Sequence, residues 1–368
     1  MKRTVLFVQN RTHRAGAQTC LARLLRHELI KQWNPVLVCS PGGWLVEECK
    51  RIDVPVIEEQ FPSSRSLPVR LFGNAIFARR VCARLAERSI SPTIIQANDH
   101  QEGLLGLEIG ERLGAQAAIF LRSPTMTRRD FYKYRCDRYG FISAVGDEFR
   151  DRVQSWIQSS DIALIRDGIF ADEIGLPKTK PFQVPSRVLV IGSPLGWKGW
   201  ADLTEALFLL EQGGALPPMQ FDFTGVVPDP AENNLKLARL GTARCNFLGR
   251  VEAFRDLVLS YDLVINPSRM ETFGLAAIEV LAAGVPLLSS RTGVIEQVQE
   301  NQRLLFIPSS PESLAAALRY VLEHWDRVDF GIARSQELIR ERFLIDRTVV
   351  QLNAAYERLQ SQRPGQPA

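Results

Sequence analysis

Residues 267–286 read PSRMETFGLAAIEVLAAGVP and carry the strongest structural signal in this chain. The apolar run at 263–265 just before them predicts a strand, and a helix is expected to begin near Phe273 and Gly274. A strand, a glycine-bearing turn and a helix N-terminus form a site for anionic phosphate, because unpaired backbone N–H groups and the helix dipole point at the ligand. Glu271 and Glu279, eight positions apart, add hydroxyl acceptors on either side of such a phosphate.

Short apolar runs alternate with amphipathic stretches along the whole chain. In the first half the runs lie at 5–8, 36–39, 93–96, 117–121, 141–145 and 162–165. In the second half they lie at 188–191, 221–224, 246–248, 263–265, 286–289 and 304–307. Parallel sheets built from strand–helix–strand units give this pattern, because their strands are buried on both faces. Two such sets in 368 residues predict an α/β protein with two doubly wound, Rossmann-like domains.

The expected domain boundary follows from composition. Residues 176–185 hold three Pro and two Lys without periodicity and read as a linker. We therefore predict an N-terminal domain over 1–182 and a C-terminal domain over 183–342. The polar tail 361–368, with two Pro and a Gly, is expected to be disordered.

Composition and charge limit the class of protein. An apolar fraction of 45% and a charged fraction of 23% are ordinary for a soluble globular protein, and no apolar run reaches the length of a membrane span. Six Cys without metal-ligand spacing are expected to be buried thiols of a cytoplasmic protein. Residues 1–182 carry a net charge of +7 and residues 183–368 one of −3. The positive charge of residues 1–182 could attract an acidic partner. Alternatively, this charge only increases solubility.

The 267–286 stretch resembles the Glu-x7-Glu motif of family 4 glycosyltransferases, which are retaining enzymes with the GT-B fold. The resemblance includes Pro267-Ser268, Phe273-Gly274 and the trailing AGVP at 283–286. It implies two Rossmann-like domains that face a cleft. It also implies a C-terminal helix, at about 343–360, that crosses back to the N-terminal domain.

A second segment, IGSPLGWKG at 191–199, follows a predicted strand and precedes an apparent helix. It resembles the family segment in which Arg and Lys hold the donor diphosphate. Lys198 matches the Lys, whereas Ser193 stands where the family usually has Arg. A point charge at Lys198 can neutralise a leaving diphosphate. The alternative for Lys198 is an ordinary solvated surface lysine.

Three further segments resemble donor-side parts of the family. FLGRVE at 247–252 resembles the lining of the nucleobase pocket, with backbone groups near Val251 reading the base. TGVIE at 292–296 resembles a Gly-Gly-x-x-Glu turn, or is a plain turn with a helix cap. AGAQ at 15–18 resembles a turn whose backbone approaches the donor phosphate, where Gly16 permits close approach.

Two features in the N-terminal half belong to the expected acceptor side. Asp99, at the end of the third apolar run, resembles a residue that accepts an acceptor hydroxyl, or it caps a helix start. Arg122 stands where the family often has His. A fixed cation at that place would suit an acidic sugar or a phosphate-bearing acceptor.

Residues 65–88 combine six Arg with interleaved apolar residues and a single Glu. A basic amphipathic helix of this kind suits the surface of an anionic membrane. A helix that packs on the core and exposes a solvated Arg face gives the same pattern.

The resemblance implies a retaining glycosyltransferase, a hexosyltransferase in the simplest case, that acts in polysaccharide biosynthesis. Expected partners are a UDP- or GDP-sugar donor and a glycan or lipid-linked acceptor, with peripheral contact to the inner face of the membrane and no nucleic acid. Glu271, Lys198 and Asp99 are the expected catalytic residues. The expected donor-binding residues are Gly16, Ser193, Val251, Phe273, Gly274, Leu275 and Glu279.

Neither a cofactor nor a metal is expected, because the chain has no Gly-x-Gly-x-x-Gly and no Asp-x-Asp. Two other functions stay open at this point. One is a non-catalytic nucleotide-sugar-binding protein of the same fold, favoured by the departures at Ser193 and Arg122. The other is a GT-B nucleotide-sugar epimerase or phosphorylase.

Overall fold

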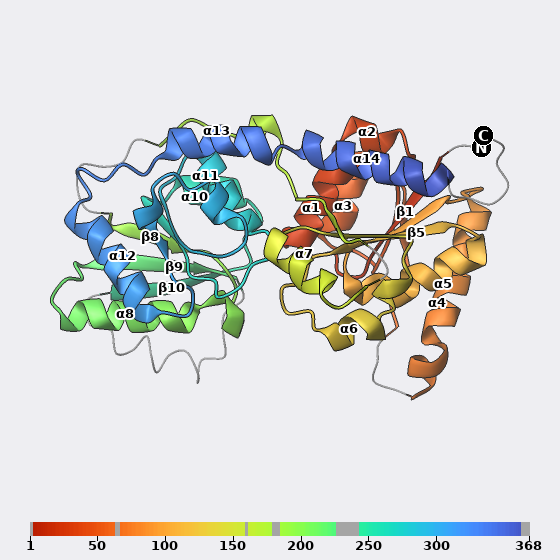
Figure 1. Ribbon diagram of the computed structural model, residues 1–368, viewed down its shortest axis with the longest axis horizontal. Coiled ribbons are helices and arrows are strands. Elements are labelled where there is room, and N and C mark those ends of the chain that lie inside the picture. Colours follow the sequence, from red (N-terminus) through yellow and green to blue (C-terminus); the bar gives the residue numbers. More distant parts are fainter. Residues whose placement is uncertain (1–2, 63–66, 159–160, 179–184, 226–242, 362–368) are drawn as a thin grey trace. The chain divides into compact units, whose positions relative to one another are not determined.

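The computed structural model describes residues 3–62, 67–158, 161–178, 185–225 and 243–361 (Figure 1). The chain forms two compact units. We call them the N-terminal domain, Met1–Gly168 with Ile345–Ala368, and the C-terminal domain, Ile169–Leu344. Each domain holds one sheet in which every strand pair is parallel. The predicted α/β class with two Rossmann-like domains is therefore confirmed.

The N-terminal sheet has seven strands in the order β3-β2-β1-β4-β5-β6-β7. Its strands are β1 (Val5–Gln9), β2 (Val36–Cys39), β3 (Val56–Glu58), β4 (Ile94–Ala97), β5 (Gln116–Leu121), β6 (Phe141–Ala144) and β7 (Ala163–Leu164). All residues of β1, β2 and β4 are buried, because helices cover both faces of a parallel sheet. The strand order reverses between β1 and β4, which is the position where ligands bind in open α/β sheets.

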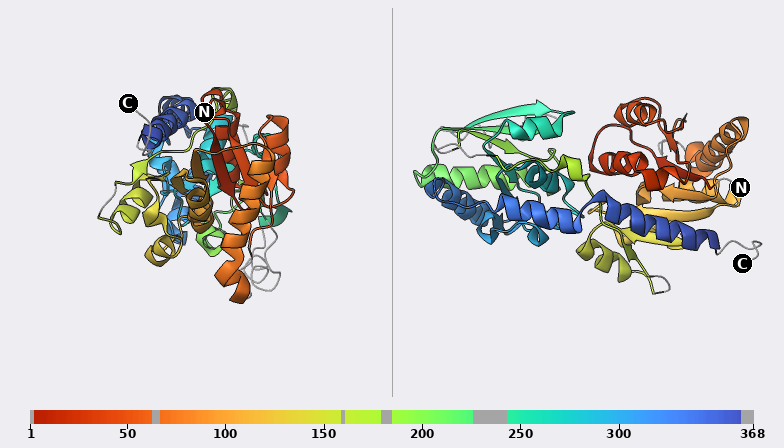
Figure 2. Two further views of the ribbon diagram at one scale, coloured as in Figure 1. Left: turned by 90° about the vertical axis from the view of Figure 1, so that its right-hand side faces the viewer. Right: turned by 90° about the horizontal axis from the view of Figure 1, so that it is seen from above.

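Helices connect and cover these strands. They are α1 (Gly16–Arg26), α2 (Glu28–Lys31), α3 (Trp44–Arg51), α4 (Leu67–Glu87), the 3-10 turn η1 (His100–Glu102), α5 (Gly103–Leu113), α6 (Arg128–Lys133) and α7 (Asp147–Gln154). The last helix of the chain, α14 (Ile345–Ser361), belongs to this domain and packs against α1, α2 and β4. Figure 2 shows this deep blue helix beside the red helices of the N-terminal segment. Residues 362–368 of the predicted tail lie outside the described residues.

The C-terminal sheet has six strands in the order β10-β9-β8-β11-β12-β13. Its strands are β8 (Arg187–Val190), β9 (Met219–Thr224), β10 (Ala243–Gly249), β11 (Leu263–Asn266), β12 (Leu287–Ser290) and β13 (Leu305–Phe306). Its helices are the 3-10 turn η4 (Gly196–Lys198), α8 (Trp200–Gln212), α10 (Phe254–Leu259), α11 (Leu275–Ala283), α12 (Pro311–Glu323) and α13 (Ile332–Arg342). The order reverses between β8 and β11, so this domain also has a switch point.

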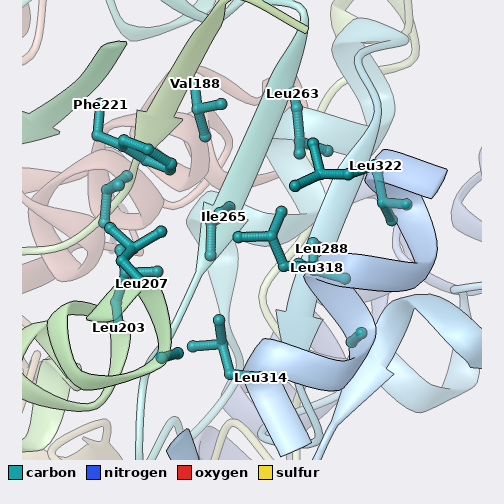
Figure 3. Close-up of a cluster of buried hydrophobic side chains, with 14 of the residues drawn as sticks. Val188, Leu203, Leu207, Phe221, Leu263, Ile265, Leu288, Leu314, Leu318 and Leu322 are labelled. Carbon is teal, nitrogen blue, oxygen red and sulfur yellow. The ribbon is translucent and has the colours of Figure 1, made fainter. Parts of the chain in front are cut away.

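Helices α8 and α12 pack together against one face of this sheet (Figure 3). Leu314, Leu318 and Leu322 of α12 recur every four residues and point at the sheet, as an amphipathic helix requires. They meet Ile265 and Leu288 from the central strands. Burying one such Leu side chain stabilises a fold by about 1.5–3 kcal/mol, so this layer holds the central strands, and the loops that follow them, in place.

Each of the twelve predicted apolar runs overlaps a strand of the structure. The prediction missed β3, a three-residue strand at the sheet edge whose sequence, Val56-Ile57-Glu58, is too short for a clear period. The boundary between the two compact units falls between Gly168 and Ile169, earlier in the chain than the predicted boundary between residues 182 and 183. Residues 175–178 pack on the C-terminal domain, since Lys178 donates its backbone N–H to the Gly284 carbonyl at 2.7 Å. Residues 179–184 of the predicted linker lie outside the described residues.

The six cysteines are free thiols. Burial raises the pKa of Cys39 and of Cys49 to about 12, so both stay protonated and unreactive near neutral pH. In the part of the chain that the structure describes, no helix combines the length and the apolar character needed to cross a membrane.

Candidate functional site

The C-terminal switch point brings together the two segments that the sequence singled out. The loop after β8 leads through Ser193 to Lys198, and the loop after β11 leads through Glu271 to helix α11. Strands β8 and β11 are hydrogen-bonded neighbours, with Val190 level with Ile265. Both loops therefore leave the same edge of the sheet side by side, where open α/β domains bind ligands.

Lys198 and Glu271 form an ion pair. The Lys198 Nζ lies 2.5 Å from the Glu271 Oε1, although the two residues are 73 positions apart in the sequence. Their side chains are only 18% and 14% exposed, so Lys198 is not the solvated lysine of the alternative interpretation. The Lys198 ammonium also lies over the Trp197 ring, 4.4 Å from its centroid. An ammonium carries three N–H donors, so Lys198 can keep Glu271 and still donate to a phosphate oxygen.

The loop that holds Ser193 is tied to the neighbouring strand β9. The Thr224 hydroxyl donates to the Gly192 carbonyl at 3.0 Å, and the Gly192 N–H donates to that hydroxyl. A Cβ on Gly225, which has φ +103°, would lie 2.8 Å from the Ser193 Cα. Only glycine fits there, because the two backbones approach so closely. Ser193 thus sits on a rigid loop but supplies no cation in place of the expected Arg.

Helix α11 begins at a glycine and has no side-chain cap. Gly274 is its N-cap, with φ +86°, so the cap position has no side chain that could accept an N–H of the helix, and the first turn holds no acidic residue. The first N–H groups of a helix lack partners within the helix, so Leu275 and its neighbours can donate to an anion. Whether this helix start binds the phosphate that the sequence predicts stays a prediction.

Phe273 differs from its expected place in the donor site. Its side chain is only 3% exposed and packs edge-on against Phe343, with ring centroids 5.4 Å apart. Its carbonyl accepts the N–H of Val294. The side chain of Phe273 therefore holds the loop in place, and only its neighbour Gly274 opens the helix.

Glu279 is the single ionisable residue of α11, whose remaining sequence is Leu, Ala, Ile and Val. Six of its nine residues are buried, and Glu279 is partly exposed. An apolar helix packed into a domain core gains nothing from a carboxylate, because burial disfavours charge. Glu279 thus lies on the partly exposed side of a helix that is otherwise packed into the core, and its contact with a ligand stays a prediction.

The turn at 292–294 lies against the Glu271 loop. Gly293 has φ +64°, and a Cβ there would lie 2.4 Å from the Phe273 carbonyl oxygen and 3.2 Å from the Glu271 Cβ. The glycine therefore permits a close approach that any other residue would prevent. The resemblance had singled out this turn, and the structure gives it a supporting place beside Glu271.

Val251, the expected base-reading position, follows β10 at the same edge of the sheet. Gly249, at the end of β10, accepts the Gly225 N–H at 2.7 Å. That bond joins the turn after β10 to the turn after β9, which in turn contacts the Ser193 loop. The C-terminal domain thus collects Ser193, Lys198, Val251, Glu271 and the start of α11 at one edge.

The N-terminal switch point holds Asp99, which acts as a helix cap. Its Oδ1 accepts the backbone N–H of His100 at 2.7 Å and that of Arg122 at 3.1 Å, and its Oδ2 accepts the Ser123 hydroxyl. Burial by itself would raise the pKa of Asp99, but the bonds from His100, Ser123 and Arg122 hold that pKa below its usual value. The capping alternative is thus observed, and Asp99 stays ionised.

Arg122 is not the exposed cation that would recognise an acidic sugar. It is only 6% exposed, and its Nη1 donates to both carboxylate oxygens of Asp167. Its Nε donates to the Asn98 side chain at 3.2 Å. The sequence interpretation of Arg122 was wrong, because a buried carboxylate from a loop 45 residues away neutralises its charge.

Gly16 is the first residue of α1, which also has no side-chain cap. Gly16 is exposed, and a Cβ there would meet no atom within 4 Å. Packing within the domain therefore does not require glycine at this position, and the predicted close approach of its backbone to a donor phosphate stays a prediction. No group of His, Cys, Asp and Glu in the described residues could hold a metal ion.

Residues 185–324, less than half of the chain, match the family model "Glycosyl transferases group 1". Glycogen synthase of Mycobacterium tuberculosis is 29% identical over 168 residues, which are 45% of this chain and 40% of that protein. The GDP-mannose-dependent alpha-(1-6)-phosphatidylinositol dimannoside mannosyltransferase of the same species is 33% identical over 81 residues, 22% of this chain and 21% of that protein. The matches thus span two fifths or less of these relatives.

Among solved structures, HepE of Anabaena in complex with UDP-glucose superimposes with a TM-score of 0.78. The two chains are 17% identical, and the match covers 97% of this chain and 99% of HepE. A likeness at that identity concerns the fold, and it confirms the GT-B architecture predicted from the sequence.

Proposed function

We propose that this protein is a retaining glycosyltransferase, a hexosyltransferase in the simplest case, that takes a sugar from a nucleotide diphosphate donor. The observation that carries the proposal is the Lys198–Glu271 pair beside the uncapped N-terminus of α11. A cation and backbone donors suit a leaving diphosphate, and a carboxylate beside them suits the hydroxyls of the attached sugar. The match to glycosyltransferases over 185–324 supports the same chemistry.

In this proposal each residue of the C-terminal edge has one role. Lys198 and the N–H groups after Gly274 hold the diphosphate, and Glu271 holds the sugar that is transferred. Glu279 binds the ribose, and backbone groups near Val251 contact the base. The bond from the anomeric carbon to the phosphate oxygen breaks and the nucleoside diphosphate leaves with the electron pair. The oxygen of an acceptor hydroxyl forms the new bond to the anomeric carbon, and its proton passes to the leaving diphosphate. No enzymic nucleophile is assigned.

The donor is expected to be a UDP- or GDP-sugar, since HepE binds UDP-glucose and the matched mannosyltransferase uses GDP-mannose. The acceptor is expected to be a glycan or a lipid-linked sugar on the cytoplasmic side. A thermal-shift comparison of UDP-glucose, GDP-mannose and an ADP-sugar tests the donor class, because only a ligand bound by the native state raises the unfolding temperature. No shift with any of the three would contradict the proposal.

The second candidate is a binding protein of the same fold without catalysis, favoured by Ser193 in place of a phosphate-binding Arg. If the protein is a transferase, we expect it to hydrolyse its donor slowly when no acceptor is present. Release of free sugar from the donor that gives the thermal shift therefore distinguishes an enzyme from a binder. Binding without any release would support the binder.

Chelation is expected to leave the activity intact. The proposed site supplies one cation, Lys198, and a helix N-terminus at the diphosphate, which is the part that Mg²⁺ takes in metal-dependent transferases. Donor hydrolysis should therefore proceed equally with EDTA and with added Mg²⁺ or Mn²⁺. Activity that EDTA abolishes and Mn²⁺ restores would show that the diphosphate needs a metal.

We also propose peripheral contact between helix α4 and anionic membrane. The side chains of Phe77, Val81 and Leu85 pack into the core, as the core-facing interpretation of this helix requires. Phe72 and Ile76, however, are 61% and 50% exposed. Exposed apolar side chains on a basic helix suit the boundary between headgroups and acyl chains.

The arginines of α4 contribute unequally to this surface. Arg79 is exposed, while Arg80 and Arg84 lie 3.5 Å and 3.0 Å from the carboxylate of Glu59, which is only 6% exposed. Replacing Arg80 and Arg84 would leave that carboxylate without its partners. Arg79 is therefore the better position for a test. The position of Arg65 and the side chain of Arg70 lie outside the described residues.

Phe72→Ser with Ile76→Ser should abolish co-sedimentation with phosphatidylserine vesicles, and Arg79→Gln should weaken it, since each Arg near an anionic surface contributes about 1 kcal/mol. Hydrolysis of a soluble donor should not change. Val350→Ser on α14, which removes another exposed apolar side chain, is the control. If the wild-type protein does not sediment with these vesicles, α4 is a solvated helix and the proposed membrane contact is wrong.

A further inference from the structure

An ion pair between Arg269 and Asp202 attaches the loop that carries Glu271 to the start of helix α8. Neither residue was among the predicted site residues. Arg269 donates from Nε to the Asp202 Oδ2 at 2.7 Å and from Nη2 to the Asp202 Oδ1 at 2.6 Å. Two parallel hydrogen bonds of this kind fix orientation as well as distance, because both groups are planar. Asp202 is 10% exposed and belongs to the first turn of α8, so it is itself held firmly.

Two backbone contacts strengthen the same junction. The Arg269 N–H donates to the carbonyl of Trp197, the residue before Lys198, at 2.8 Å. Gly199 has φ +69°, and a Cβ there would lie 1.9 Å from the Pro267 carbonyl oxygen, so the two backbones touch. The segment 197–202 and the segment 267–269 are thus joined on both sides of Lys198.

The other end of the Glu271 loop has its own attachment. Val294 donates its N–H to the Phe273 carbonyl at 3.0 Å, and Phe273 is buried. Glu271 therefore lies between two fixed points, Arg269 before it and Phe273 after it. Loss of the Arg269 side chain would remove the two hydrogen bonds to Asp202, while the backbone bond from Arg269 to Trp197 and the start of α11 would stay in place.

We propose that Arg269, through Asp202, is a positioning residue that holds the Glu271 carboxylate against the Lys198 ammonium. This inference rests on the proposed function, in which Glu271 contacts the sugar and Lys198 the diphosphate. In this inference Arg269 acts through Glu271, because its Nε and Nη2 donate to the carboxylate of Asp202. A carboxylate displaced by about 1 Å from its working position can cost about a hundredfold in rate, so the anchor has a catalytic consequence.

The test uses the full chain and compares Arg269→Ala and Arg269→Lys with wild type. Donor hydrolysis is measured with UDP-glucose and with GDP-mannose, and UDP and GDP binding by calorimetry. Arg269→Ala should lower kcat by about 10- to 100-fold and change the affinity for the nucleoside diphosphate by less than about threefold. Arg269→Lys should recover only part of kcat, because Lys cannot donate in parallel to both oxygens of Asp202.

A double variant separates positioning from a general loss of stability. If Arg269 acts through Glu271, then adding Arg269→Ala to Glu271→Gln should lower kcat further by less than about twofold, because residues that act as a unit are not additive. The matched control is Arg334→Ala, which breaks an exposed ion pair with Glu337 on α13 and should leave kcat unchanged. The unfolding temperature of every variant is measured alongside.

The outcomes distinguish this inference from the proposed function. Wild-type protein that neither binds nor hydrolyses either donor would overturn both. An active wild type with a fully active Arg269→Ala would overturn the positioning role alone. A loss of kcat that multiplies fully with that of Glu271→Gln, or one that follows the drop in unfolding temperature, would also overturn it.

Discussion

Glu271→Gln is expected to lower kcat by about 30- to 1000-fold with little loss of stability. The change keeps the shape of the side chain and removes its charge. A charge-assisted hydrogen bond at the reacting centre contributes about 2–4 kcal/mol to the transition state, by analogy with the donors of oxyanion sites. The Lys198 ammonium, 2.5 Å from this carboxylate, would also lose the partner that orients it. Donor hydrolysis under saturating donor measures the effect.

The control for Glu271→Gln is Glu337→Gln, the same chemical change at an exposed ion pair on α13. That variant should hydrolyse the donor at the wild-type rate. Equal unfolding temperatures for the two variants would show that the loss at Glu271 is catalytic. A fully active Glu271→Gln would remove this residue from the reacting centre, whatever its place in the structure.

Lys198→Ala is expected to weaken the binding of a nucleoside diphosphate by about 10- to 150-fold, since a hydrogen bond to a charged group contributes about 1.5–3 kcal/mol. Binding of the free nucleoside should change little, because Lys198 is proposed to contact only the diphosphate. Calorimetry with UDP and uridine, or with GDP and guanosine, measures the two affinities. Equal losses for both ligands would place Lys198 outside the phosphate site.

The ion pair adds a sharper test. In Lys198→Ala the carboxylate of Glu271, only 14% exposed, faces the diphosphate without a cation and repels it. The double variant Lys198→Ala/Glu271→Gln should therefore bind the nucleoside diphosphate more tightly than Lys198→Ala alone. Lys50→Ala, at an exposed ion pair with Glu47 in the N-terminal domain, is the control and should bind as wild type does.

The strands of both domains could be predicted from the sequence because a strand buried on both faces must be apolar throughout. Val5–Val8 and Leu263–Ile265 are apolar at every position, and such a run can be recognised without knowing which strands lie beside it. Strand β3 was missed, since three residues at a sheet edge carry no such pattern. Helix α4 was found as a basic amphipathic helix, but the sequence could not say that Glu59 would neutralise two of its arginines.

For the candidate site, too, the positions of the residues along the chain could be predicted, whereas their side-chain partners could not. The sequence alone predicts that Lys198, Glu271 and the start of α11 follow the carboxyl ends of parallel strands, because the local apolar pattern shows where each strand ends. Which side chains pair became clear from the three-dimensional structure, namely Lys198 with Glu271, Arg269 with Asp202 and Arg122 with Asp167. Those partners lie 73, 67 and 45 positions apart, and the strand order and the packing of α8 set their distances. An ion pair depends on atomic separation, which a local sequence pattern does not contain.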